Sequence, residues 1–268
     1  MSETEGEEDV EGDVLREAGA DAALAERLAV PSSPRSIFLE EASVYRPVLT
    51  GDVFRGVRVP GSSDAEAAYD LTMIVSHPSV MRDGPALAER AQAAPVFPIG
   101  GVRRTAWTPD RFDIFPLPFL RDVAASNGFD NVEKRAWAAD LRLSGPIETS
   151  ALDVHKRVAC LSPEGVLLLL QRLVHTDTRA AVRLDTLELV FLAKLEEVEL
   201  LETWTEEYLT AHPPGELFDG LARCAADFNT FLGGTDPESG IEIRGMLGRP
   251  LHRTVAERLV WAEIERRA

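Results

Sequence analysis

Two stretches of the sequence contain residue types that could take part in chemistry. The first is Ser76-His77-Pro78-Ser79-Val80-Met81-Arg82, which follows the apolar segment 71–75. An imidazole can transfer a proton near neutral pH, and a guanidinium can hold a phosphate through two parallel hydrogen bonds. Ser76, His77 and Arg82 are therefore the candidate catalytic residues. The alternative is that His77 packs against its neighbouring proline at a strand end and that Arg82 is a surface charge.

The second stretch, residues 154–183, is basic although the chain as a whole is acidic. Its net charge is +3, whereas the 268-residue chain has a formal net charge of −17. Arginine clusters bind the phosphates of nucleic acids, so Arg157, Arg172 and Arg179 are candidate RNA-binding residues. The alternative is that Arg172, Arg179 and Arg183 form ion pairs with the acidic helix expected after them.

Composition and missing motifs narrow the possible functions. The sequence has no phosphate-loop, dinucleotide-binding, nucleophile-elbow or zinc-protease motif, so we expect no metal and no cofactor. No stretch reaches the roughly 20 consecutive apolar residues of a membrane-spanning helix. Cys160 and Cys224 are too far apart to suggest a disulfide framework, and Cys160 is expected in the core. Together with the acidic first residues, these features predict a cytoplasmic protein that does not bind membranes.

The chain divides into three regions by composition. Residues 1–35 hold ten acids and three arginines and close with a proline- and serine-rich segment, which predicts a disordered acidic lead. Residues 36–184 contain short strand-like segments, with a long irregular insertion at 100–134 whose aromatic side chains should pack against the protein. Residues 185–268 carry helical patterns. Strands followed by helices predict an α+β fold, in which the helical C-terminal region packs on a barrel-like β domain.

Six short strands are expected from apolar alternation or continuous apolar runs, bounded by turn residues. Pro98 should make the third of them an edge or bulged strand, because proline cannot donate to a neighbouring strand. The expected strands are 51–60, 71–75, 94–99, 135–143, 154–161 and 180–184.

Four helices are expected in the C-terminal half. Ser162-Pro163-Glu164 provides a cap and a first-position proline for a helix to about residue 174. The strongest pattern is at 185–209, with an acidic face that should be solvated. Its apolar face consists of Leu187, Phe191, Leu195 and Val198. The last two helices are expected at 215–232 and 254–267, the second opening with the capping box Thr254-x-x-Glu257.

Three of these strand segments resemble strands in the small SH3-like barrel of the MazF/PemK toxin family. The segment Thr50-Gly51-Asp52-Val53-Phe54 is similar to the family's opening Gly-Asp-Val/Ile strand. Thr72-Met73-Ile74-Val75-Ser76 resembles its buried second strand, and Ala94-Pro95-Val96-Phe97-Pro98-Ile99 resembles its third. The segment 155–161, followed by Arg172, is similar to a later stretch of the family. The resemblance covers about residues 47–184 and implies a small SH3-like β-barrel with a long insertion.

The resemblance also implies a function. Proteins of this toxin–antitoxin family are metal-independent endoribonucleases that cut single-stranded RNA through an Arg and a Ser or Thr. This chain has Tyr69-Asp70-Leu71-Thr72 where the family has its Arg, and Gly100-Gly101 where a hydroxyl residue normally follows. Arg55 or Arg103 could replace the missing Arg, which adds Arg55 to the candidate RNA-binding residues. The resemblance also allows that this chain is a relative that has kept the barrel and lost the ribonuclease activity.

Three functions remain open at the level of sequence. The first is an endoribonuclease or RNA binder, in which the acidic lead covers a basic cleft until it is displaced. The second is a non-enzymatic interaction or regulatory protein, in which the helices from Asp185 onward form a docking surface or a homodimer seam. The third is a small-molecule hydrolase that uses His77 or His155. The expected partners are accordingly a single-stranded RNA, another protein or a second copy of the chain.

Overall fold

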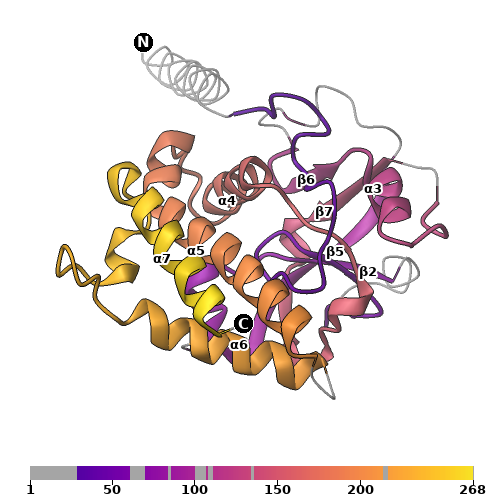
Figure 1. The fold of residues 1–268 in the computed structure, drawn as a ribbon. Coiled ribbons are helices and arrows are strands. Elements are labelled where there is room, and N and C mark those ends of the chain that lie inside the picture. Colours follow the sequence, from indigo (N-terminus) through magenta and orange to yellow (C-terminus); the bar gives the residue numbers. More distant parts are fainter. Residues whose placement is uncertain are drawn as a thin grey trace, which may run out of the picture.

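The chain folds into an antiparallel sheet with helices packed against it (Figure 1). A computed structural model describes residues 29–60, 70–83, 86–99, 107, 111–133, 136–213 and 217–267. Most of the predicted acidic lead, the Gly100-Gly101 step and Arg103 lie outside these ranges. The mixed α+β class predicted from the sequence is confirmed.

Seven strands form the main sheet, in which every pairing is antiparallel. They are β1 (Val53–Arg55), β2 (Leu71–Ile74), β5 (Arg90–Ile99), β6 (Ile114–Leu117), β7 (Ala136–Asp140), β8 (Gly145–Glu148) and β9 (Arg157–Ala159). Their order is β6-β7-β5-β2-β1-β9, and β8 pairs with the first half of β5. Among the described residues the sheet is open, because β6 and β9 at its two ends do not pair with each other. A separate two-stranded hairpin consists of β3 (Arg82–Asp83) and β4 (Ala86–Leu87).

The central strands are buried on both faces. Val53 and Met73 belong to one apolar core, whereas their chain neighbours Phe54 and Ile74 belong to another on the opposite face. This alternation follows from the two-residue repeat of a strand. The first core also contains the apolar residues of the helices that cover the sheet, and the second contains the loops on its other side.

The helices are α3 (Leu120–Ser126), α4 (Pro163–Thr178), α5 (Leu184–Ala211), α6 (Leu217–Leu232) and α7 (Pro250–Arg267). The Ser162 side chain accepts a hydrogen bond of 3.1 Å from the N–H of Gly165, as the predicted cap requires. The predicted apolar face of α5 is confirmed, since its four residues are buried in the same core as the sheet. On its other sides α5 contacts α6 and α7, which form a third core around Trp204 and Phe228 (Figure 1).

Several predicted boundaries differ from the structure. The strand expected at 51–60 is only three residues long, because Gly56 turns the chain with a φ of 80°. No strand forms at 180–184; this segment leads directly into α5. The helix expected at 254–267 begins earlier, at Pro250, so Thr254 is an exposed residue inside α7 and not its cap.

The third predicted strand and the insertion also differ. β5 is the central strand and pairs with β2, β7 and β8, so the prediction of an edge strand is wrong. Pro98 is tolerated there because it lies beyond Val96, the last residue of β5 that pairs with β2. The insertion at 100–134 is not wholly irregular, because it contains β6 and α3. Its aromatic residues Trp107, Phe112 and Phe115 are buried, as predicted, but Phe119 is 49% exposed.

Candidate binding site

Two of the predicted catalytic residues, Ser76 and His77, pack against other parts of the protein. The Ser76 hydroxyl is buried and accepts a hydrogen bond of 2.6 Å from the N–H of Gln92. His77 is half-buried, and its ring lies 4.4 Å from that of Phe191 on α5; burial lowers the pKa of this imidazole. The backbone of Arg82 lies in β3, and its side chain falls outside the described part of the structure. Helix α5 therefore contacts the strand end at which His77 lies.

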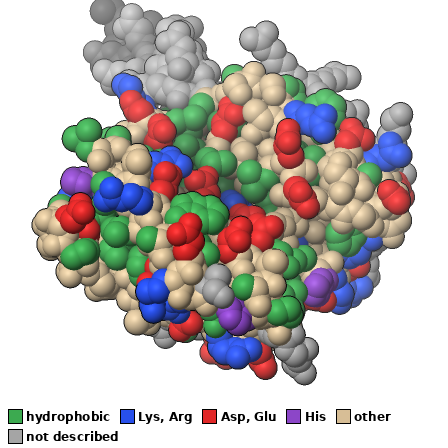
Figure 2. All heavy atoms as spheres, viewed as in Figure 1, with side chains coloured by type: hydrophobic (Ala, Val, Ile, Leu, Met, Phe, Trp, Pro, Cys, Tyr) green, Lys and Arg blue, Asp and Glu red, His purple; other side chains and the backbone are tan. Residues whose placement is uncertain are grey.

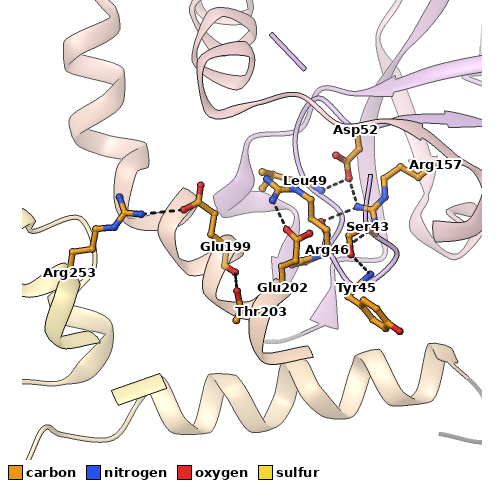
Figure 3. A network of polar contacts seen from close by, with 11 residues as sticks. Ser43, Tyr45, Arg46, Leu49, Asp52, Arg157, Glu199, Glu202, Thr203 and Arg253 are labelled. Atoms are coloured by element: carbon orange, nitrogen blue, oxygen red, sulfur yellow. Dashed lines mark hydrogen bonds and ion pairs between the residues drawn. The ribbon is translucent and has the colours of Figure 1, made fainter. Parts of the chain in front are cut away.

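Arg157 lies inside the protein and not on an RNA-binding surface. Its Nη1 is 2.9 Å from Oδ2 of Asp52, and its Nη2 donates hydrogen bonds to the carbonyl groups of Ser43 and Arg46 (Figure 3). The guanidinium thus joins the start of β1 to the segment that precedes it. A side chain with 0% exposure and these partners is a structural cation.

Arg172 is also buried, in an aromatic environment. Its guanidinium carbon lies 4.9 Å from the ring centre of Trp107 and 4.8 Å from that of Phe112. Its Nη1 donates a hydrogen bond of 2.8 Å to the carbonyl group of Ile114. Burial lowers the pKa of Arg172 to about 9. This side chain attaches α4 to β6 and does not reach the surface.

The two other predicted RNA-binding residues lie nearer the solvent. Arg55 donates a hydrogen bond of 2.5 Å to Asn131 and lies 5.8 Å from the ring centre of Phe129. Arg179 is exposed and ends α4 in a left-handed conformation, with a φ of 58°. The structure therefore does not gather Arg55, Arg157, Arg172 and Arg179 into one cleft.

Four acidic residues of α5, Glu196, Glu197, Glu199 and Glu202, form ion pairs with arginines of neighbouring elements. Glu202 lies 2.7 Å from Nη1 of Arg46, and Arg253 of α7 lies 3.6 Å from both Glu196 and Glu199. Glu196 is buried and accepts a hydrogen bond from the N–H of Gly248, so the prediction of a wholly solvated face is wrong there. On the face shown in Figure 2, acidic and basic side chains are interspersed.

A cavity of about 360 Å³ lies where the loops beneath the sheet meet α5 and α6. Its walls come from residues 45–48, from β4, from residues 149–154 and from the facing sides of the two helices. Most of the wall is apolar: Val48, Leu87, Leu152, Val154, Leu201 and Leu221. The cavity therefore lies between the core beneath the sheet and the core of the helical layer.

Two polar side chains of the cavity wall stand out from this apolar lining. Arg46 is 5% exposed and is held by its ion pair with Glu202, as Figure 3 shows. Thr205 lies on α5, one turn beyond Glu202, and is 2% exposed. A mainly apolar pocket with a few polar groups is the usual composition of a ligand-binding site in proteins.

This cavity could not be predicted from the sequence. Its residues come from five separate parts of the chain, and none of them belongs to a recognised motif. One expectation from the sequence did point to this region: the helices from Asp185 onward were expected to form a docking surface. Leu201 and Thr205 of the cavity wall lie on α5, the first of these helices.

Comparison with known proteins finds no matching family model, no matching curated protein and no matching solved structure. None of the described helices is both long and apolar enough to cross a membrane. No group of three or more His, Cys, Asp or Glu residues in the described ranges is arranged to hold a metal ion.

Proposed function

We propose that this chain is a non-enzymatic regulatory protein that binds an apolar ligand in the cavity between the sheet and α5–α6. The observation that carries the proposal is the cavity itself, which is large enough for a small organic molecule and lined mainly by aliphatic side chains. Burying apolar surface there supplies the free energy of binding, about 25 cal/mol per Å².

A regulatory role follows from the position of the cavity. Val48, Leu152 and Val154 belong to the β part of the protein, whereas Leu201 and Leu221 belong to the helical layer. A ligand that touches both parts stabilises their contact, because it binds only the state in which they are packed together. The surface formed by α5, α6 and α7 is then presented to a protein partner in a ligand-dependent way.

The uncharged fluorescent probe N-phenyl-1-naphthylamine tests the proposal. We expect the protein to bind it with a rise in fluorescence, and Ala225→Phe to weaken binding by about tenfold or more, because the new ring occupies the cavity. The matched control is Ala226→Phe, which adds the same ring one residue further along α6 at an exposed position. An absence of probe binding, or equal binding by both variants, contradicts the proposal.

RNA binding by a MazF/PemK-like, SH3-like barrel is the second candidate function. Its support is the strand pairing: the three segments that carry the resemblance lie side by side as β1, β2 and β5. β9 pairs with the other edge of β1. Of the predicted RNA-binding residues, Arg55 and Arg179 have side chains at or near the surface.

Fluorescence anisotropy with a short labelled single-stranded RNA tests this second candidate. We expect an affinity that falls as salt rises, and a loss of about threefold or more in the double variant Arg55→Ala/Arg179→Ala, because phosphate contacts dominate such binding. Arg258→Ala on α7, which also removes an exposed arginine, serves as the control. Lack of RNA binding even at low salt contradicts this second candidate function. A gel of the same samples shows whether the RNA is cut.

A further inference from the structure

The cavity wall contains hydrogen-bonding capacity that the described part of the protein does not use. The hydroxyl group of Thr205 takes part in no hydrogen bond with a described residue. Two other threonines of these helices, Thr203 and Thr230, each donate to the carbonyl group four residues earlier, at 3.2 and 2.9 Å. Nε of Arg46 also has no partner among the described residues, although its Nη1 is bound to Glu202.

The helix spacing and the ion pair of Arg46 indicate that these two residues lie near each other in the cavity wall. Thr205 and Glu202 are three residues apart on α5, so they share one side of the helix, and Glu202 holds Arg46 at 2.7 Å. Thr205 offers an O–H donor, and Arg46 offers an N–H donor. A buried donor without a partner, such as Nε of Arg46, is destabilising, and a ligand oxygen that accepts a hydrogen bond from it removes that cost.

The charges around this end of the cavity are already balanced. Arg46 is paired with Glu202, and the neighbouring Arg157 is paired with Asp52 at 2.9 Å. Of the described residues that line the cavity, Arg46 alone is charged. A ligand carboxylate would add an uncompensated negative charge beside Glu202, and a ligand ammonium would add a positive charge beside Arg46. Either addition is costly in a site of low dielectric.

From the unused donors and the balanced charges we infer that the cavity binds an uncharged apolar molecule with a carbonyl oxygen, such as an aliphatic amide, ester or ketone. The hydrocarbon part lies among the aliphatic side chains, and the carbonyl oxygen accepts a hydrogen bond at the Thr205–Arg46 end. This inference rests on the proposed binding function and adds the chemical class of the ligand.

Three probes with the same hydrocarbon chain separate the possible head groups: octanamide, octanoate and octylammonium. Each is titrated at neutral pH against the protein loaded with N-phenyl-1-naphthylamine. We expect octanamide to displace the probe at a concentration about fivefold lower than either charged compound, as one hydrogen bond and an avoided charge burial predict. Equal displacement by octanoate or octylammonium overturns the inference and leaves the binding function in place. Failure of the protein to bind the naphthylamine overturns the binding function itself.

Two substitutions test the assigned donors. Thr205→Val keeps the shape of the side chain and removes the hydroxyl, so it should abolish most of the fivefold advantage of octanamide over octanoate and octylammonium, each measured by displacement of the naphthylamine from the variant itself. Arg46→Lys keeps the charge opposite Glu202 and removes the Nε donor, and a smaller loss is expected. Thr203→Val is the control, since that hydroxyl is bound to the carbonyl group of Glu199. An unchanged octanamide preference in Thr205→Val overturns the assignment.

Discussion

Replacing Asp52 by Asn is expected to lower the free energy of unfolding by about 3–5 kcal/mol, because it leaves the buried guanidinium of Arg157 without its counter-ion. The two side chains are 2% and 0% exposed, and their ion-pair distance is 2.9 Å. Burial acts to lower the pKa of Arg157, but the charge and hydrogen bond of Asp52, together with Cys160 and Glu202, hold the pKa above its usual value, so the group stays charged. Asn retains an oxygen for the N–H of Leu49, which Asp52 now accepts at 3.0 Å.

Urea unfolding followed by tryptophan fluorescence measures this loss. The matched control is Glu148→Gln, the same carboxylate-to-amide change in an ion pair with Arg90 that is also 2.9 Å long but exposed at 66% and 52%. An exposed pair is worth no more than about 1 kcal/mol, so the control should change stability little. Similar losses in the two variants would show that burial of the Asp52–Arg157 pair is not what makes it important.

Loss of the Asp52–Arg157 pair should also affect the candidate site. Arg157 donates hydrogen bonds to the carbonyl groups of Ser43 and Arg46, and so holds the segment that forms one wall of the cavity. Arg157, which we predicted to bind RNA, thus positions one wall of the cavity. Its type and its basic neighbours were visible in the sequence, but the direction of its side chain depends on acceptors more than 100 positions away.

The helices could be predicted well because their signal is local. The apolar residues of α5 repeat at spacings of three and four, and the cap of α4 is adjacent to the helix that it starts. The strand ends were harder, because the length of a strand depends on its partners. β1 is short, although Val57 and Val59 continue the apolar alternation and are buried, because the chain turns at Gly56 and the pairing stops.

The candidate site could not be predicted for a related reason. Residues 45–48, 149–154, 201–205 and 221–225 each have an ordinary composition, and only the packing of the helices against the loops beneath the sheet brings them together. The surroundings of His77 also depend on the tertiary structure. Its position at a strand end was predictable, but its cover by Phe191, more than 100 residues later, was not.

The second large effect is expected at Gly51, the residue before Asp52 in the same turn. Its φ is 90°, and a Cβ at this position would lie 2.4 Å from Cδ1 and 2.9 Å from Cβ of Leu161, which is itself buried. Gly51→Ala should therefore lower the free energy of unfolding by about 3 kcal/mol, through backbone strain together with overpacking. Urea unfolding again gives the measurement.

Gly128→Ala separates the two causes, because Gly128 has a φ of 85° but nothing within 4 Å of the added Cβ. We expect it to cost about 1 kcal/mol, the backbone term alone. If Gly51→Ala lowered the free energy of unfolding no more than Gly128→Ala does, Leu161 would be able to move aside. The turn would then not need its close packing against Leu161. If the larger losses are found in both Gly51→Ala and Asp52→Asn, the structure requires both residues: Gly51 for its contact with Leu161, and Asp52 for its pairing with Arg157. The Gly-Asp step that suggested the MazF/PemK resemblance then has a full explanation in folding, and its presence adds no argument for ribonuclease chemistry.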